Sequence, residues 1–245
     1  MKTTETILEL IRLVRTLRVK CPWDRKQTLY TIKNNIIEEA YEVVEAIEKR
    51  NLNVLKEEIG DLLFLGIFLV DLLRVKGITL KEIINVTVKK YKDKHPHVFK
   101  SKKFKNTNEI VKYWHNSKKD IFKGIPYLLP ALIAARLIQE RAARVGFDWN
   151  DALGPRKKLL EEIKELEKTC SRKKMREEMG DILFSCVNLA RHLKLDPEEA
   201  LRQANKKFVM RFRLMQKKLA KENKDLSSLS LEEMDRVWNK IKNRN

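Results

Sequence analysis

Apolar residues recur along the chain at the three- and four-residue intervals of amphipathic helices. Residues 4–18 show this first, with Ile7, Leu10, Ile11 and Val14 on one face. No stretch longer than a few residues alternates as a strand does. The pattern predicts an all-α fold, with further helices over about 28–49, 54–76, 79–92, 131–145, a helical hairpin over 156–192, a long helix from 197 and a C-terminal helix.

Residues that start and stop helices support these ranges. Pro22 disfavours helix at the residue before it, which ends the first segment. Gly77 suits a C-terminal stop, and Thr79 an N-cap. Asp196 followed by Pro197 predicts the start of the long helix.

Composition agrees with a helical protein. Hydrophobic residues make up 43% of the 245 residues, and Gly (7) and Pro (6) are scarce. The three cysteines have no CxxC spacing, which suits reduced thiols. The longest apolar run, residues 62–70, is far short of the ~20 residues that cross a bilayer. We expect a soluble, cytoplasmic protein.

The chain contains an internal duplication. Asp61 and Asp181 lie 120 positions apart, and the sequences after them, GDLLFLGIFL and GDILFSCVNL, are alike. We therefore predict two tandem domains, 1–123 and 124–245, with cores of the four-helix-bundle type that a second copy completes.

Carboxylates at helical spacing carry the first chemical signal. Glu162 and Glu165 lie three residues apart, as do Glu178 and Asp181 on the next segment, and a polar turn over residues 168–173 separates them. Folding at that turn gathers four like charges, which repel unless a cation lies among them. We predict a Mg²⁺ site, with Mn²⁺ as a possible substitute. The alternative is a solvated acidic helix face.

The first repeat has the same carboxylate pattern, which makes it a second and weaker candidate metal site: Glu39, Glu42, Glu58 and Asp61. Asn35 and Val54 stand where the second repeat has Lys158 and Lys174. We therefore expect the second domain to be the main catalyst, and the first to be vestigial, regulatory or selective for another substrate. Four residues could partly replace the missing cations and a terminal Trp/Lys pair: Lys90, Lys94, Trp114 and Lys118.

Ordered motifs resemble the MazG family of nucleoside triphosphate pyrophosphohydrolases over essentially the whole chain. They are CPWD (21–24), EEAYE (38–42), EEIGD (57–61), KHPHVF (94–99), RVGFDW (144–149), KLLEEIKE (158–165), KMREEMGD (174–181), NKKFVMRF (205–212) and MDRVWNKIK (234–242). The resemblance implies an all-α, magnesium-dependent enzyme that hydrolyses nucleoside triphosphates (NTPs) to monophosphate and pyrophosphate, usually as a homodimer.

Cations near the second carboxylate group are candidates for phosphate contact. Lys158 and Lys174 each lie four residues before a ligand glutamate, and Lys207 and Arg211 share that spacing on the next predicted helix. Any one of them could be an ordinary surface residue. As a set they match the family's NxKFxxRF motif, which favours nucleotide binding.

Four other residues complete the predicted site. Glu161 and Glu177 lie beside the ligands and could act as base or orient a ligand, or be surface charge. Trp238 could stack a nucleobase and Lys242 accompany it; the alternative is Trp238 as a core or interface anchor. The resemblance favours base contact, which tolerates many bases and suits both NTPs and deoxynucleoside triphosphates (dNTPs).

A formal net charge of +19 leaves two other hypotheses open. The chain could be a helical nucleic-acid-binding module, or a helical interaction scaffold with degenerate nucleotide sites. Buried carboxylates without metal would repel phosphate, so we expect nucleic acid to bind only weakly and nonspecifically, if at all.

Overall fold

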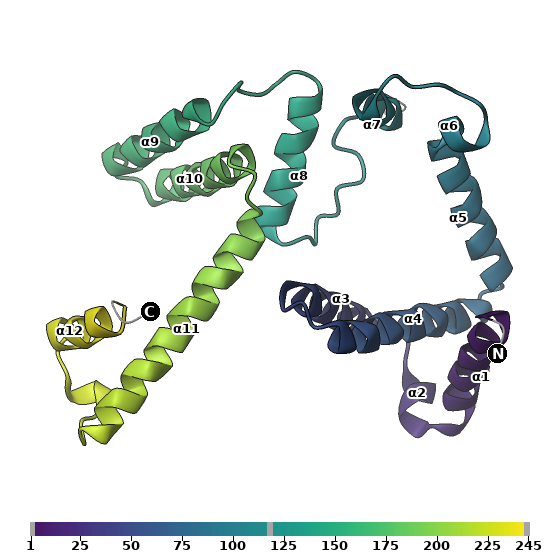
Figure 1. Cartoon of the computed structure of the whole chain (residues 1–245), viewed down its shortest axis with the longest axis horizontal. Helices are drawn as coiled ribbons and strands as arrows, with labels where there is room; N and C mark the ends of the chain where they lie inside the picture. The colour runs from purple at the N-terminus through teal and green to yellow at the C-terminus, as the bar shows by residue number, and fades with distance from the viewer. Residues whose placement is uncertain (1–2, 117–119, 243–245) are drawn as a thin grey trace. The chain divides into compact units, whose positions relative to one another are not determined.

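The computed structural model describes residues 3–116 and 120–242, and these form helices without a strand (Figure 1). The predicted all-α fold is confirmed. The chain divides into two compact units, Met1–Lys105 and Asn106–Asn245. This division places α7 in unit 2, whereas the predicted domain ranges, 1–123 and 124–245, place it in the first domain; those ranges stay a prediction.

The helices of unit 1 are α1 (Thr3–Lys20), α2 (Pro22–Lys26), α3 (Lys33–Glu48), α4 (Leu52–Arg74), α5 (Leu80–Lys94) and α6 (Pro96–Phe99). Those of unit 2 are α7 (Thr107–Asn116), α8 (Ala131–Arg144), α9 (Leu153–Lys168), α10 (Arg172–His192), α11 (Pro197–Lys221), a short 3₁₀ helix (Leu226–Ser228) and α12 (Leu231–Lys242).

Unit 1 is built on the hairpin of α3 and α4, with α1 packed along α4. Its core has five buried side chains, which come from α1, the turn before α3, and α4: Val14, Ile32, Leu65, Phe68 and Leu72. Ile36 of α3 packs against them. Each such side chain contributes roughly 1.5–3 kcal/mol by leaving water. This packing fixes α3 against α4, the two helices that carry the first carboxylate group.

Unit 2 repeats the hairpin as α9 and α10, and α8 packs against α10 and α11. Gln139 on α8 is buried and donates a hydrogen bond from Nε2 to the carbonyl oxygen of Phe184, at 2.8 Å. A separate apolar cluster joins α11 to α12 through Met215, Leu219 and Ile241. Figure 1 shows α12 beside the C-terminal half of α11, away from α9 and α10.

Several predicted helix ends are confirmed. Thr79 and Glu82 form a reciprocal capping box at α5, and Asp196 accepts a hydrogen bond from the Glu199 N–H at α11. Gly77 has a φ of 80°, the left-handed conformation that suits a residue just past a helix end.

The predicted start of the second helix at Thr28 or a neighbour is wrong, because residues 29–32 form a turn and α3 begins at Lys33. The Thr28 N–H donates to Thr31 Oγ1 at 2.9 Å. Threonine side chains that bond locally to the backbone compete with helix formation.

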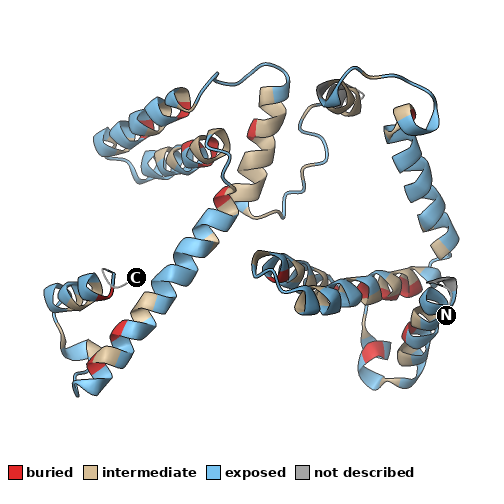
Figure 2. Ribbon diagram, in the orientation of Figure 1, coloured by how far each residue is buried: buried red, intermediate tan, exposed pale blue. Residues whose placement is uncertain are grey.

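Many large apolar side chains remain exposed, notably along α5, α10 and α11 (Figure 2). Within residues 3–116 and 120–242, no helix is long and apolar enough to cross a membrane.

Candidate metal and nucleotide site

Three of the four predicted ligands in unit 2 come together across the hairpin. Glu162 on α9 and Glu178 and Asp181 on α10 offer carboxylate oxygens that all lie within 4.8 Å of one another. Glu162 is buried, with 4% of its surface exposed, whereas Glu178 is half-buried and Asp181 exposed. The cluster therefore has a buried side and a side open to a substrate.

The hairpin geometry produces this convergence. Helix α9 ends at Lys168 and α10 begins at Arg172, so the turn falls within the predicted residues 168–173. Glu162 lies six residues before the end of α9, and Glu178 six residues after the start of α10. Antiparallel helices bring residues at equal distances from a turn to the same level.

Lys158 contacts this cluster directly. Its Nζ lies 2.7 Å from Glu161 Oε1 and 2.6 Å from Glu162 Oε1. The hydrogen bonds to Glu161, and then to Glu162, stabilise the charged ammonium group and so raise the pKa of Lys158. One cation thus already offsets part of the negative charge at Glu162.

The fourth predicted ligand, Glu165, is exposed and lies outside the three-carboxylate cluster. Loss of hydration, and then repulsion from Glu162, raise the pKa of its carboxyl group, while Lys158 opposes that rise. Glu165 therefore experiences the charge of the cluster. The two predicted catalytic residues, Glu161 and Glu177, are both exposed beside it.

The predicted nucleotide-binding residues are divided between two regions. Lys158 is at the carboxylates, and Lys174 is exposed on the first turn of α10. The other four lie on α11 and α12, which extend away from the hairpin in Figure 1: Lys207, Arg211, Trp238 and Lys242. The structure does not bring these four to the carboxylates of the same chain.

Trp238 is half-buried against α11. Its ring centroid lies 5.2 Å from that of Phe208, with the planes tilted by 46°, and Phe208 is stacked on Phe212 at 6.0 Å. Trp238 also packs on the cluster that joins α11 to α12. The structure thus has features of both alternatives, an anchor in the packing and an aromatic surface that is partly accessible.

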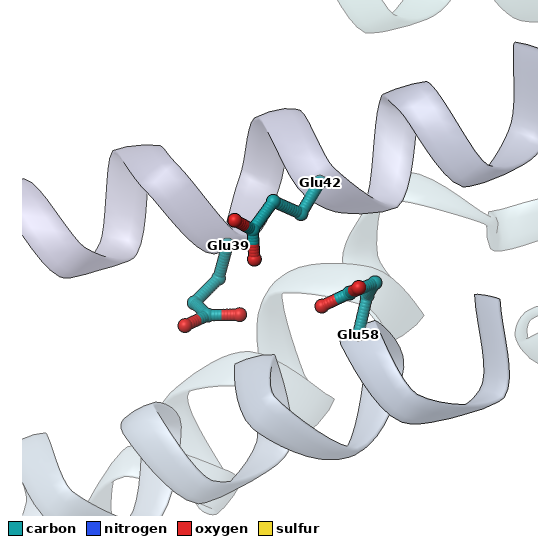
Figure 3. Close-up of side chains that lie close together, drawn as sticks. All are labelled: Glu39, Glu42 and Glu58. Atoms are coloured by element: carbon teal, nitrogen blue, oxygen red, sulfur yellow. The ribbon is translucent and has the colours of Figure 1, made fainter. Parts of the chain in front are cut away.

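Unit 1 also forms a cluster of three carboxylates in its hairpin, from a different three of its four predicted ligands. Glu39 and Glu42 project from α3 toward Glu58 on α4, and their oxygens lie within 4.8 Å of one another (Figure 3). The fourth predicted ligand, Asp61, is exposed and outside this cluster. Half-buried Asn35 and Val54 occupy the positions that correspond to Lys158 and Lys174.

The charges of this first cluster are poorly balanced. Loss of hydration, followed by repulsion from Asp61 and Glu42, raises the pKa of Glu39. Loss of hydration and repulsion from Glu42 likewise raise the pKa of Glu58. Glu39 Oε2 is buried and has no hydrogen-bond partner among the described residues. A hard divalent cation fits this set of oxygens.

The residues expected to replace the cations that unit 1 lacks are not on α3 or α4, the helices of the first cluster. Lys90 and Lys94 are exposed on α5, and Trp114 is half-buried on α7. Lys118 lies outside the described residues.

Comparison with known proteins places both hairpins in one family. A model of the MazG nucleotide pyrophosphohydrolase domain matches residues 27–99 and 153–215, which include both carboxylate clusters. The chain is 42% identical over 241 residues to the nucleoside triphosphate pyrophosphohydrolase/pyrophosphatase MazG of Thermotoga maritima, covering 96% of this chain and 94% of that protein.

Two further relatives extend the comparison. The nucleoside triphosphate pyrophosphohydrolase of Escherichia coli K12 is 36% identical over 258 residues, covering 99% of this chain and 98% of that protein. The uncharacterized protein YabN of Bacillus subtilis is 37% identical over 245 residues, covering 94% of this chain and 50% of that protein. The resemblance inferred from the motifs is confirmed.

Proposed function

The chain belongs to the MazG nucleotide pyrophosphohydrolase family, and we propose that it hydrolyses NTPs and dNTPs to the nucleoside monophosphate and pyrophosphate by attack of water at the α-phosphorus. One observation carries this proposal beyond family membership. It is the convergence of Glu162, Glu178 and Asp181 within 4.8 Å, with the Lys158 ammonium in contact with Glu162.

The donor set fits a hard divalent cation. Clustered carboxylates, one of them buried, suit Mg²⁺ or Mn²⁺ rather than softer metals. Glu162, Glu178 and Asp181, with Glu165 beside them, would hold the ion. Bound Mg²⁺ would polarise phosphate oxygens and lower the pKa of a water molecule.

The chain's own residues then have separate roles. Lys158 and Lys174 flank the carboxylates and would bind phosphate oxygens, offsetting the charge that develops on the leaving pyrophosphate. Glu161, already hydrogen-bonded to Lys158, and Glu177 are the candidates to accept the proton of the attacking water. Their exposure leaves them accessible to substrate.

Lys207, Arg211, Trp238 and Lys242 would complete the nucleotide site from α11 and α12. Arg211 suits two-pronged phosphate contact. Stacking on Trp238 would tolerate any base, which supports broad NTP and dNTP use. We call α11 and α12 together the arm. Because the arm lies away from the hairpin of its own chain (Figure 1), a partner copy is the natural source of these four groups.

We therefore propose a homodimer. Exposed apolar side chains on α10 and α11 support it, because such faces are normally covered: Met175, Met179, Leu183, Phe208, Val209, Met210 and Leu214. Light scattering at micromolar concentration should give twice the chain mass. A monomer with full activity would contradict this part of the proposal.

A mixing experiment tests whether the arm acts across the dimer. Glu178→Gln disables the hairpin, and Lys207→Ala with Arg211→Ala disables the arm. If the sites are shared between copies, re-equilibrated mixtures of the two inactive variants should recover about a quarter of parental activity, because half the dimers have one intact site. No recovery would indicate that each chain builds its own site.

The reaction itself is tested by product analysis. NTPs and dNTPs incubated with Mg²⁺ should yield monophosphate and pyrophosphate, and EDTA should stop turnover until Mg²⁺ or Mn²⁺ is restored. In H₂¹⁸O the label should enter the monophosphate, since water attacks the α-phosphorus. Label in pyrophosphate, or turnover unaffected by chelator, contradicts the mechanism.

We also propose a cytoplasmic location, which the sparse, unpaired cysteines support.

A further inference from the structure

The motif RVGFDW (144–149) has no part in the proposed chemistry, yet it contacts both helices of the metal hairpin. Two adjacent residues, Asp148 and Trp149, precede α9. The Asp148 side chain bonds to the C-terminal end of α10, whereas the Trp149 side chain lies on the first turn of α9.

Two side chains at the end of α10, Arg191 and His192, contact the carboxylate of Asp148. Arg191 Nη1 lies 2.8 Å from Asp148 Oδ2 and Nη2 2.5 Å from Oδ1, in a two-pronged contact, and His192 Nε2 lies 2.9 Å from Oδ1. Arg191 is itself oriented by Asn188 Oδ1 at 2.6 Å. The Arg191 hydrogen bonds, above all, lower the pKa of Asp148 to about 2.

Trp149 holds the other helix. A Cβ placed on Gly154 would lie 2.1 Å from Trp149 Cδ1, far closer than any real carbon contact. The indole ring therefore covers the α9 backbone at a position where only a hydrogen fits. Together, Asp148 and Trp149 connect the start of α9 to the end of α10.

The carboxylate cluster lies between this connection and the hairpin turn. Gly154 precedes Glu162 by eight residues, about 12 Å along α9, and Arg191 follows Asp181 by ten residues, about 15 Å along α10. From Glu162 to the turn at the end of α9 is six residues, about 9 Å. A hairpin fixed only at its turn can splay at the level of the ligands; a second fixed point prevents that.

Unit 1 has an ion pair at the corresponding position of its second hairpin helix, but there the helix residue is the acid and its partner is the base. Asp71 follows Asp61 by ten residues, as Arg191 follows Asp181, and Asp71 pairs with Arg18 of α1 at 3.6 Å. The Arg18 guanidinium also donates to the backbone carbonyl of Asp24, in the CPWD segment that precedes the hairpin. In unit 1, too, an ion pair therefore connects the end of the second hairpin helix to the segment that precedes the hairpin.

We propose that Asp148 and Trp149 are positioning residues, which set the separation of α9 and α10 at Glu162, Glu178 and Asp181 and thereby the affinity of that cluster for a divalent cation. The inference rests on the proposed function, because it assumes that these carboxylates bind metal.

The test measures metal binding directly, by electron paramagnetic resonance of Mn²⁺ titrated into the full chain. Every protein carries Glu58→Gln, to weaken the first cluster. Asp148→Asn should raise the dissociation constant about tenfold, the usual size for loss of a group that orients a metal ligand. Asp148→Glu keeps the charge and should stay within about threefold of the parent.

A matched control separates positioning from general loss of stability. Asp196→Asn removes a carboxylate of the same unit that pairs with Arg136 of α8 at 3.4 Å and caps α11, and it should leave Mn²⁺ affinity unchanged. Gly154→Ala, which displaces Trp149, should weaken Mn²⁺ binding by a second route. Circular dichroism confirms that each variant is folded at the temperature of the titration.

Unchanged Mn²⁺ affinity in Asp148→Asn and Gly154→Ala would overturn the inference, as would an equal loss in Asp196→Asn. Mn²⁺ binding that disappears with Glu58→Gln alone would contradict both this inference and the assignment of the metal to unit 2. Failure to hydrolyse NTPs while Mn²⁺ binding follows the expected order would contradict only the proposed function.

Discussion

Glu39 in unit 1 and Glu162 in unit 2 occupy equivalent places in their hairpins, but their electrostatic surroundings differ. Lys158 Nζ lies 2.6 Å from Glu162, whereas the position equivalent to Lys158 in unit 1 is Asn35. Loss of hydration, and then repulsion from Asp61 and Glu42, instead raise the pKa of Glu39. The same ligand types therefore occur once with an ammonium group and once without it.

This difference teaches that a carboxylate cluster alone does not identify the catalytic unit. A metal ion needs anionic ligands, but a bound triphosphate adds several negative charges that the ligands repel. The counter-charge at Lys158 and Lys174 therefore distinguishes the proposed catalytic unit from its duplicate more sharply than the ligands do.

The largest expected effect comes from removing one ligand in each unit. Glu178→Gln should lower kcat by roughly a hundredfold or more, as loss of a key electrostatic group typically does. Glu58→Gln should leave NTP turnover within a fewfold of the parent, because unit 1 lacks the two lysines. Steady-state kinetics with each variant checks this; the reverse order would make unit 1 the catalyst.

Exchanging the lysine itself sharpens the comparison. Lys158→Asn gives unit 2 the residue of unit 1 and should lower kcat/KM about ten- to a hundredfold, since hydrogen bonds to charged groups contribute about 1.5–3 kcal/mol. Lys164, exposed on the same helix, provides the control: Lys164→Asn should change kcat/KM less than threefold. Equal effects would show that only the net charge of α9 matters.

One carboxyl group in each unit should make the free energy of unfolding depend on pH, and the two dependences should have opposite signs. Asp148 has a folded pKa of about 2, below its ordinary 3.8, so its contribution is present above 3.8 and is lost as the pH falls toward 2. That contribution is on the order of 2 kcal/mol. Asp148→Asn should therefore lower the melting temperature at pH 6 and much less near pH 2; a pH-independent difference would contradict this.

For Glu58 in unit 1, the change of stability with pH has the opposite sign. The folded pKa of Glu58 is raised above 4.5, so the native state binds more protons than the unfolded state and stability falls as the pH rises through 4.5 toward the raised value. Glu58→Gln should raise the melting temperature at pH 7 in EDTA, and not at pH 3. Thermal scans at the two pH values measure this, and added Mg²⁺ should reduce the advantage of the variant.

The smallest expected difference concerns the hairpin turns. Asn51 Oδ1 accepts hydrogen bonds from the N–H groups of Asn53 and Val54 at the start of α4, whereas the Ser171 side chain makes no such bond at α10. Asn51→Ala should lower the free energy of unfolding by about 1 kcal/mol, and Ser171→Ala by a few tenths at most. Urea unfolding followed by circular dichroism compares them.

Local sequence signals anticipated much of the fold and part of the candidate site. Caps at Thr79 and Asp196 were predictable because they depend on residues three positions away. The four-residue spacing likewise placed Lys158 on the face of Glu162. The start of α3 was predicted wrongly, since the hydrogen bonds of Thr28 and Thr31 hold a turn that helical periodicity does not reveal.

Contacts between distant segments could not be predicted in this way. Asp148 and Arg191 are separated by 43 positions, and their pairing depends on how far α10 extends and where the preceding loop lies. Periodicity also left two alternatives open for Trp238, whose contact with Phe208 depends on the packing of α12 on α11. The motif RVGFDW was the one signal of the Asp148 connection.

The length of α11 has a mechanical consequence. The helix has 25 residues. Phe208, whose ring contacts that of Trp238, lies eleven residues after the first residue of the helix, about 17 Å along the axis. A pivot of about 10° at that end would move the aromatic pair by about 3 Å, the length of one hydrogen bond. If Trp238 stacks on a nucleobase, as proposed, a rotation of this size where α11 meets α8 and α10 would be enough to make or break that contact.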